Sequence, residues 1–372
     1  MMENRKLKIL FLTNIPSPYR VAFFNKLGQY CDLTVCFEGK NATDRDDKWR
    51  ADSARYFSQV FLNGIRTGAD NFLCLGIQKY LRLQWDHIII GGYSTPTQML
   101  AIEYLRIKKI PFIFEADGGF IKEDKKMIYT IKRHFISSAD MWLSTGKMTT
   151  DYFVHYGAEQ QRCYIYPFTS LVQKDIDNTL ISHDEKIRLR EKLNMTESRI
   201  IITVGQFIYR KGFDVLLKAM NAIPEDVGVY FIGGVPTEEY LEIQRQNGLD
   251  NAHFIGFKTK DELNEYYRAA DLFVLPTRED IWGLVINEAM AKGLPVITTD
   301  KCGAGLELVR DNGRIISADY VTELAEAINE LLRDENVLRR MSERSLEIIQ
   351  GYTIEKMTKE HIAIWNNELQ KD

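Results

Sequence analysis

Short apolar runs alternate with amphipathic segments along this chain of 372 residues. In the first part, the apolar runs predict strands at residues 8–13, 33–37, 57–62, 87–90, 111–115, 141–144 and 163–166, with helices between them, including one at 72–83. The alternation restarts at 199–204 and continues through 228–232, 252–255, 271–275 and 295–298, with a turn at 303–305 and a short strand near 314–316. Strands that alternate with helices this regularly pack as a parallel, doubly wound α/β sheet. The sequence therefore predicts two such sheets.

A polar, charged segment at residues 168–198 separates the two series. A chain of this length exceeds the usual size of a single hydrophobic core, so two domains are expected. We predict one Rossmann-like domain at residues 1–168 and a second at 169–352, facing an interdomain cleft. Binding sites in such sheets lie beyond the carboxyl ends of the strands.

Composition and charge exclude several classes of function. The formal net charge of −4 disfavours a general nucleic-acid binder. The five cysteines are scattered, odd in number and without a C-x-x-C pair, which fits a reducing cytosol and no zinc site. No apolar run approaches the length of a membrane span, and the run near the N-terminus is too short for a signal peptide. We therefore expect a cytoplasmic protein.

The stretch from residue 271 to 299 combines a strand, an acidic loop, a helix and a second strand. Asp280 lies in the loop, and Glu288 follows eight residues later, in a helical turn that we expect to be buried nearly all round. A carboxylate there is costly unless something hydrogen-bonds it. The helix start would present the unpaired N–H groups of Gly283, Leu284 and Val285, which form a ready anion site that both carboxylates could face.

A structural role is the alternative for both acids. Asp280 would then cap the helix N-terminus, and Glu288 would pair with Lys292 one turn further along a wet helix face. The residue types leave both interpretations open.

A second motif, G-Q-F-I-Y-R-K-G, runs from Gly205 to Gly212 after the predicted strand 199–204. It carries Arg210 and Lys211 to the start of the next helix. Two cations at the carboxyl edge of a sheet suit a diphosphate, because each can neutralise phosphate oxygens. The alternative is a pair of solvated charges on a loop.

The acidic stretch also carries a resemblance to a known family. Asp280-x7-Glu288, within PTREDIWGLVINEAMAKGLPVI, resembles the E-x7-E segment of the retaining glycosyltransferases of family 4, which have the GT-B fold. The first position is Asp here, with Glu279 beside it, so either acid is a candidate for that position. The resemblance also implies that the C-terminal helix, at residues 353–372, packs back on the first domain.

The glycine-bounded turn is similar to the segment of the same family that holds the donor diphosphate, G-R-x…K-G. Lys211 matches the Lys of that segment, and Gln206 occupies the place where Arg is frequent. Arg210 is the candidate to supply the charge that Gln206 lacks.

The resemblance implies further donor contacts in the second domain, which it makes the donor-binding one. Glu288 would accept hydrogen bonds from the ribose hydroxyls, because an ionised carboxylate is an acceptor only. Asp280 would contact the transferred sugar or steady the charge at its anomeric carbon. The remaining implied contacts are to the diphosphate, through Gly205, Gln206, Arg210, Lys211 and the N–H groups of Gly283, Leu284 and Val285, and to the base, through backbone near Phe257 and Lys258.

The first domain, expected to bind the acceptor, departs more from this family. A His often follows the fifth strand there and contacts the transferred sugar, whereas this chain has Glu115-Ala116-Asp117-Gly118-Gly119. Asp117 is the candidate for that place. The alternative is an ordinary Asp-Gly turn.

Two other enzyme classes are disfavoured. Asp44-Arg45-Asp46 spells the D-x-D of metal-dependent glycosyltransferases of the other major fold, but it lies in a polar loop and is read as a solvated turn. The six histidines show no ligand spacing, so no catalytic metal is predicted. No G-x-G-x-x-G follows a strand, which disfavours a nicotinamide-dependent dehydrogenase.

Residues 120–135 mix basic and apolar side chains and predict a basic amphipathic surface. Such a surface could contact an anionic membrane, which would place the protein at the inner face of the cell membrane and favour a lipid-linked acceptor. The alternative is a solvated helix face with an inward apolar stripe.

The resemblance to family 4 implies a retaining glycosyltransferase, which we expect to be metal-independent and to need no cofactor other than its donor substrate. The donor would be a nucleotide-diphosphate sugar, with uridine as the expected base, and the acceptor a saccharide or lipid-linked hydroxyl in surface or capsular polysaccharide assembly. Two alternatives stay open: a sugar-nucleotide 2-epimerase of the same fold, and a non-catalytic protein that binds sugar nucleotides.

Overall fold

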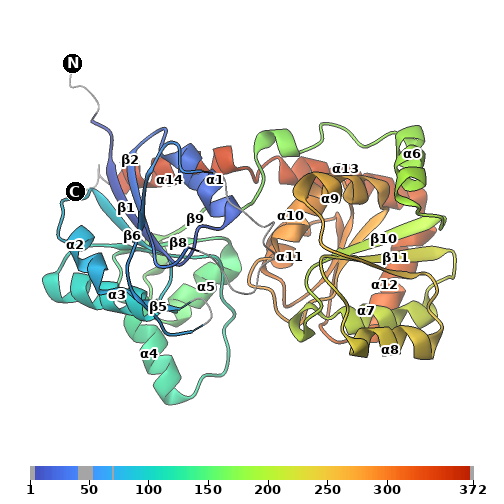
Figure 1. The fold of residues 1–372 in the computed structure, drawn as a ribbon, viewed down its shortest axis with the longest axis horizontal. Helices are drawn as coiled ribbons and strands as arrows, with labels where there is room; N and C mark the ends of the chain where they lie inside the picture. Colours follow the sequence, from blue (N-terminus) through green and yellow to red (C-terminus); the bar gives the residue numbers. More distant parts are fainter. Residues whose placement is uncertain (1–4, 41–52, 69–70, 369–372) are drawn as a thin grey trace. The chain divides into compact units, whose positions relative to one another are not determined.

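A computed structural model describes residues 5–40, 53–68 and 71–368 of the chain. It divides into two compact units, one formed by Met1–Ser170 with Ile354–Asp372 and the other by Leu171–Thr353. The boundaries predicted from the sequence are 168/169 and 352/353. Each unit is a parallel sheet with helices packed around it (Figure 1).

The first unit contains a seven-stranded sheet in the order β3-β2-β1-β6-β7-β8-β9, in which every neighbouring pair is parallel. Its strands are β1 (Lys8–Thr13), β2 (Asp32–Phe37), β3 (Ser58–Phe61), β6 (His87–Ile90), β7 (Ile113–Ala116), β8 (Met141–Ser144) and β9 (Cys163–Ile165). Its main helices are α1 (Pro18–Leu27), α3 (Pro96–Lys108), α4 (Lys126–Ile136), α5 (Lys147–His155) and α14 (Ile354–Glu368). The order of the strands reverses between β1 and β6, which is a topological switch point.

The second unit contains a six-stranded parallel sheet in the order β12-β11-β10-β13-β14-β15. Its strands are β10 (Arg199–Val204), β11 (Val227–Ile232), β12 (Ala252–Ile255), β13 (Leu272–Leu275), β14 (Val296–Thr299) and β15 (Gly313–Ile316). Its helices are α6 (His183–Leu193), α7 (Phe213–Ala219), α8 (Glu238–Asn247), α9 (Lys260–Ala269), α10 (Leu284–Met290), α11 (Gly303–Leu308), α12 (Val321–Arg333) and α13 (Glu335–Ile349). Here the strand order reverses between β10 and β13.

The central strands of both sheets are almost wholly apolar because helices cover them. In β11 every residue is buried, and the same holds for β13 and β14. A parallel sheet covered in this way leaves its loops as the exposed edges, so polar chemistry concentrates at the strand ends.

The C-terminal helix α14 belongs to the first unit and lies against α1. Its buried face carries Ile354, Met357, His361 and Trp365. The ring of His361 lies between the rings of Phe23, Tyr166 and Trp365.

The helix expected at 72–83 is wrong. The segment forms β5 (Phe72–Leu73), a 3₁₀ turn at Leu75–Ile77 and a short α2 (Gln78–Leu81). Thr97 at the start of α3 explains the extended part, because its hydroxyl donates to the carbonyl of Phe72 and accepts from the N–H of Cys74. β5 also pairs with β4 (Ile65–Arg66).

The turn expected at 303–305 is also wrong, since α11 begins there. The N–H of Gly303 donates to the carbonyl of Asp280 at 3.0 Å, and that of Ala304 donates to the carbonyl of Trp282 at 2.7 Å. These bonds satisfy N–H groups that a helix start leaves without an intrahelical partner. Gly305 then fits against Thr298, where a β carbon would lie 2.3 Å from the Thr298 methyl.

Gly212 offers a test of how closely the loop after β10 approaches the loop after β13. It has φ of 69°, and a β carbon there would lie 2.0 Å from the carbonyl oxygen of Pro276. Gly248 has φ of 60° with no atom within 4 Å of its β-carbon position, so it isolates the backbone cost of about 1–2 kcal/mol. Gly212→Ala should therefore lower the free energy of unfolding well beyond Gly248→Ala, measured by chemical denaturation. Equal losses in the two variants would contradict the close approach.

Candidate functional site

The loops at the carboxyl edge of the second sheet carry the residues that the sequence analysis singled out there. Gly205, Gln206, Arg210 and Lys211 follow β10; Phe257 and Lys258 follow β12; Asp280 and Gly283 follow β13; and Leu284, Val285 and Glu288 lie on α10. β10 and β13 are neighbours that flank the switch point, whereas β11 separates β12 from β10. The structure thus brings the β10 and β13 groups together, and places the β12 group further along the same edge.

Lys211 and Asp280 meet at this switch point. The Lys211 ammonium donates to Oδ2 of Asp280 at 2.5 Å, and the two side chains are only 12% and 14% exposed. The backbone of Asp280 is fixed as well, because its N–H donates to the carbonyl of Lys301 at 2.8 Å. A cation and a carboxylate are therefore held at the carboxyl edge of a buried sheet.

Hydrogen bonds join the loop after β10 to the loop after β13. The carbonyl of Arg210 accepts hydrogen bonds from the hydroxyl of Thr277 at 2.7 Å and from the N–H of Arg278 at 2.8 Å. The exposed guanidinium of Arg210 donates to the carbonyl of Glu279 at 3.3 Å. These bonds fix the backbone from which Arg210 and Lys211 project.

Arg278 braces the two loops, a role that the sequence analysis missed. Its guanidinium donates twice to Asp214 on α7, each at 2.8 Å, and once to Asp319 at 2.6 Å. It also donates to the carbonyl of Tyr209 and lies 4.0 Å from the centre of the Tyr209 ring. The hydrogen bonds to Asp214 raise the pKa of Arg278 further above its ordinary value. The partners are distant in sequence, so only the unusual Arg within an acidic loop could have signalled them.

The helix start after Asp280 is at Gly283, which has φ of 94° and is the N-cap of α10. Asp280 therefore does not cap this helix, and the capping alternative is wrong. Trp282 is buried just before it, and its indole donates to Oδ1 of Asn287 at 2.9 Å. Cys302 lies against the same turn, and its thiol donates a hydrogen bond to the carbonyl of Trp282.

Glu288 lies one turn along α10 and accepts a hydrogen bond from the Tyr267 hydroxyl at 3.4 Å. Burial, together with the charge of Glu288, raises the pKa of Tyr267 well above its ordinary value, so the phenol stays a donor. Glu288 is half-buried, as are Leu284 and Val285, so the expectation of a turn buried nearly all round is wrong. The buried residues of α10 are Ile286, Asn287, Ala289 and Met290, so only one side of this helix packs in the core.

Lys292, the pairing partner in the structural alternative, lies at the end of this helix. Its ammonium donates to the carbonyl of Asp175 at 2.6 Å and to the carboxylate of Asp177 at 2.8 Å. These contacts fasten α10 to the segment that enters the second unit.

In the first unit, Asp117 follows β7 as part of a charged cluster. The Arg20 guanidinium on α1 bonds to Glu115 through Nη1 and to Asp117 through Nη2. Glu115 is fully buried, whereas the Asp117 side chain is 33% exposed. The hydroxyl of Tyr19 donates to Oδ2 of Asp117 at 3.1 Å. Arg20 and Tyr19 thus fix the Asp117 side chain, which an ordinary Asp-Gly turn would not require.

The buried carboxylate of Glu115 has two further partners that help keep it ionised. It accepts from the Tyr166 hydroxyl at 3.2 Å, and Nε2 of His361 lies 3.4 Å from its other oxygen. Burial acts to raise the pKa of Glu115, but the attraction of Arg20 and His361 outweighs burial and lowers that pKa to about 2. Burial raises the pKa of Asp117, and Glu115 adds to this while Arg20 opposes it.

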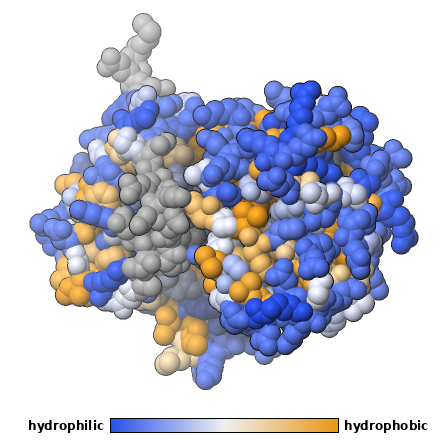
Figure 2. All heavy atoms as spheres, turned by 45° about the vertical axis from the view of Figure 1, so that its right-hand side comes forward, coloured by the Kyte–Doolittle hydropathy of each residue, from blue (hydrophilic) through white to orange (hydrophobic). Residues whose placement is uncertain are grey.

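Helix α4, which projects from the first unit, leaves most of its surface exposed; Ile136 is the one buried residue of this helix. Met127 is 73% exposed, and Ile128 and Ile131 are exposed beside it. Figure 2 shows apolar residues at the lower end of the unit, where Figure 1 places α4. Residues 120–135 contain five Lys or Arg residues and two Asp or Glu residues, within a chain of net charge −4.

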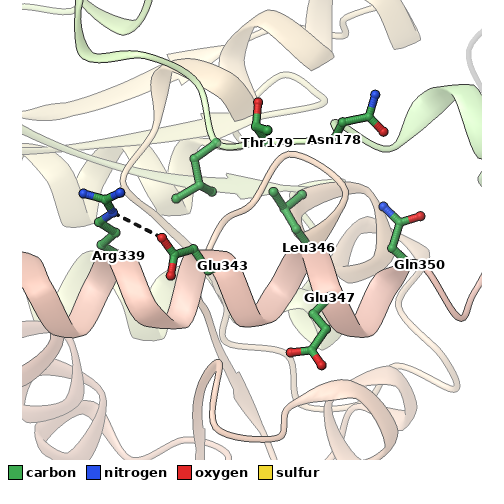
Figure 3. Close-up of a pocket in the computed structure, with 8 residues that line it drawn as sticks. Asn178, Thr179, Arg339, Glu343, Leu346, Glu347 and Gln350 are labelled. Atoms are coloured by element: carbon green, nitrogen blue, oxygen red, sulfur yellow. Dashed lines mark hydrogen bonds and ion pairs between the residues drawn. The ribbon is translucent and has the colours of Figure 1, made fainter.

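A groove of about 510 Å³ lies elsewhere, against α13 (Figure 3). None of the predicted site residues lines it. The exposed ion pair of Arg339 and Glu343, at 3.2 Å, and the apolar side chain of Leu346 face it. It offers no buried charged group, so it is not the candidate site.

In the part of the chain that the structure describes, no group of three or more His, Cys, Asp or Glu residues could hold a metal ion. Asp44-Arg45-Asp46 lies outside the described residues. Across residues 5–40, 53–68 and 71–368, no helix is long and apolar enough to cross a membrane.

Known glycosyltransferases are similar to this chain in sequence and in fold. Residues 185–347 match the family described as glycosyl transferases group 1. An uncharacterized glycosyltransferase of Methanocaldococcus jannaschii is 25% identical over 314 residues, which cover 78% of this chain and 76% of that protein. The lipopolysaccharide glucosyltransferase WaaG of Escherichia coli is 27% identical over 205 residues, about half of each chain (53% and 52%).

The crystal structure of Anabaena HepE in complex with UDP superposes with a TM-score of 0.78, covering 98% of this chain and all of that one (100%), at 18% identity. At this identity the likeness concerns the fold. Residues 185–347 thus match the model of glycosyl transferases group 1, and the two parallel-sheet units have the fold of GT-B glycosyltransferases.

Proposed function

We propose that this glycosyltransferase moves a sugar from a nucleotide-diphosphate donor to a hydroxyl of a saccharide or lipid-linked acceptor, with retention and without a metal ion. The observation that carries the proposal is the Lys211–Asp280 pair at the switch point of the second sheet. Ligands of open α/β sheets bind outside the carboxyl ends of the strands at this point.

The diphosphate is the part of the donor that this edge suits best. Lys211 carries three N–H donors, more than Asp280 alone takes up, and the exposed Arg210 adds a second cation. Cleavage of the sugar–phosphate bond builds negative charge on the diphosphate, and fixed cations stabilise that charge as it develops. The N–H groups at Gly283, Leu284 and Val285 act in the same direction.

The other donor contacts follow from position along the same edge. Glu288, half-buried and facing Tyr267, accepts hydrogen bonds from the ribose hydroxyls. Backbone near Phe257 and Lys258 holds the base. Asp280, oriented by Lys211, steadies the positive charge at the anomeric carbon, and Asp117 in the first unit contacts a sugar hydroxyl.

Two relatives support the chemical class of donor and acceptor. HepE was crystallised with UDP, which supports a UDP-sugar as donor. WaaG is named as a lipopolysaccharide glucosyltransferase, which supports an acceptor in surface or capsular glycan assembly.

A panel of nucleotide sugars tests the proposal. The matching donor should raise the melting temperature, because a ligand that binds the folded state stabilises it. Release of UDP with an acceptor, an α-linked product from an α-linked donor, and activity that survives EDTA would support transfer as described. Formation of the epimer without acceptor would instead identify a 2-epimerase, and stabilisation without any turnover would identify a binding protein.

Removal of the cations should weaken donor binding. Arg210→Ala and Lys211→Ala each remove a charge-assisted hydrogen bond of about 1.5–3 kcal/mol, so the Kd for UDP should rise about 10- to 100-fold in isothermal titration. Arg339→Ala is the matched control, because that cation lies in an exposed ion pair on α13. An unchanged Kd in both site variants would remove the diphosphate assignment.

Measurements of donor binding and of turnover can distinguish the roles of Asp280, Glu279 and Glu288. Asp280→Asn should lower kcat about 100-fold or more while UDP still binds, because it removes a charge that acts in the transition state. Glu279→Gln should change kcat little, since the Asp280 carboxylate is the one bonded to Lys211. Glu288→Gln should mainly weaken donor binding. Full turnover in Asp280→Asn with loss in Glu279→Gln would reverse the assignment of the first acid.

Helix α4 supports a peripheral membrane contact at the inner face of the cell membrane. Its exposed Met127, Ile128 and Ile131 can enter the headgroup region, and the exposed Lys125 and Lys126 match an anionic surface. A lipid-linked acceptor would be presented at such a surface.

Vesicle flotation tests this contact. Lys125→Ala/Lys126→Ala should reduce partitioning to phosphatidylglycerol vesicles about thirtyfold at low salt, from about 1 kcal/mol for each cation. Arg339→Ala/Arg340→Ala on α13 is the control. Wild-type protein that does not float, or floats equally with neutral phosphatidylcholine at every salt concentration, would exclude the membrane contact.

A further inference from the structure

The cluster beneath Asp117 has an unusual arrangement of charge. One guanidinium, that of Arg20, bonds to two carboxylates that differ in exposure. The inner one, Glu115, is fully buried, and the outer one, Asp117, is one-third exposed at 33%. Because one guanidinium is shared between the two carboxylates, Asp117 does not have a cation to itself.

The buried Glu115 carboxylate holds the Arg20 guanidinium in place and is not itself available to a ligand. Glu115 is enclosed by Arg20, the Tyr166 hydroxyl and His361 on α14, and its pKa is about 2, so it stays ionised across the neutral range. Arg20 itself is only 6% exposed and lies 5.7 Å from the centre of the Phe168 ring. The guanidinium therefore has little freedom to turn away from Asp117.

The outer carboxylate is held at several points. Oδ1 faces Arg20, Oδ2 accepts from the Tyr19 hydroxyl, and the Asp117 carbonyl accepts from the Thr145 hydroxyl at 3.2 Å. Arg20 and Tyr19 are consecutive residues of α1, so one helical turn sets both contacts. Lone pairs of both oxygens remain for further donors, because a carboxylate offers about four acceptor sites.

We propose that Arg20 is a positioning residue of the reaction: anchored by the buried Glu115, it holds Asp117 at the carboxyl end of β7 as an ionised acceptor for a sugar hydroxyl. This inference rests on the proposed function, since it requires a saccharide ligand. Tyr19 is the second positioning residue, and Asp117 is the group that touches the ligand.

The two neighbours of Asp117 should move its titration in opposite directions. The charged and titratable groups facing it are Tyr19 and Arg20 on α1, Glu115 on β7, and Tyr166 after β9. Loss of Arg20 removes an attraction and raises the pKa of Asp117, whereas loss of the Glu115 charge removes a repulsion and lowers it. kcat/KM for the acceptor falls at low pH as Asp117 becomes protonated.

The experiment is therefore a pH profile of kcat/KM for the acceptor. Arg20→Gln should move the acid limb to higher pH, Glu115→Gln should move it to lower pH, and Arg20→Lys should restore part of the wild-type position. Arg106→Gln, in an exposed pair on α3, is the control. A purely structural role would lower activity by one factor at every pH and leave the limb in place, which would overturn the proposal.

A double variant and a titration that needs no turnover separate a loss of activity from a failure to fold. Arg20→Gln leaves a buried carboxylate without its cation, so the double variant Arg20→Gln/Glu115→Gln, which removes both charges, should fold while still losing the orientation of Asp117. A ¹³C carboxyl titration of Asp117 by NMR in the same variants needs no turnover. An Asp117 titration that Arg20 does not affect overturns the inference, whereas shifted titration in a protein without transferase activity would contradict the proposed function alone.

Discussion

The second unit's site depends on the close approach of the loops that follow β10 and β13. Gly212 lies so near the Pro276 carbonyl that no β carbon fits between them, and this contact brings Lys211 to Asp280. The Arg278 brace and the hydrogen bonds to the Arg210 carbonyl then lock the two backbones. These contacts hold Lys211 and Asp280 in place without a ligand, and fixed cations stabilise developing charge without reorganising.

The alternation of apolar runs was sufficient to predict two parallel, doubly wound sheets, because a parallel strand covered on both faces must be apolar throughout. The GT-B fold itself was implied only by the resemblance of the Asp280–Glu288 stretch to a known family. Two local errors show where this reasoning ends. At residues 72–83 and at Gly303 the conformation is decided by hydrogen bonds to Thr97, Asp280 and Trp282, which lie elsewhere in the chain. No periodicity within either segment records these partners.

The candidate site also contains residues that the sequence could place and residues that it could not. Asp280, Lys211 and the α10 residues belong to two continuous motifs, so their residue types and spacing could place them at one sheet edge. Their functional roles stay predictions. The cluster around Asp117 could not be assembled from sequence, because its members come from α1, β7, the end of β9 and α14, with Glu115 and His361 separated by 246 positions. Nothing in the residues around His361 distinguishes it from a core histidine.

The Asp at position 280 is one methylene shorter than the Glu of the family pattern, and the structure gives a physical reason why the shorter acid fits. Its backbone is drawn inward by bonds to Lys301 and Gly303, and Lys211 reaches it from a loop already in contact with Pro276. A longer side chain at this position would have to fold back or displace the ammonium. The Lys211 ammonium donates to the Asp280 carboxylate, which makes Asp280 an acid that faces this cation, and the backbone carbonyl of Glu279 accepts from Arg210.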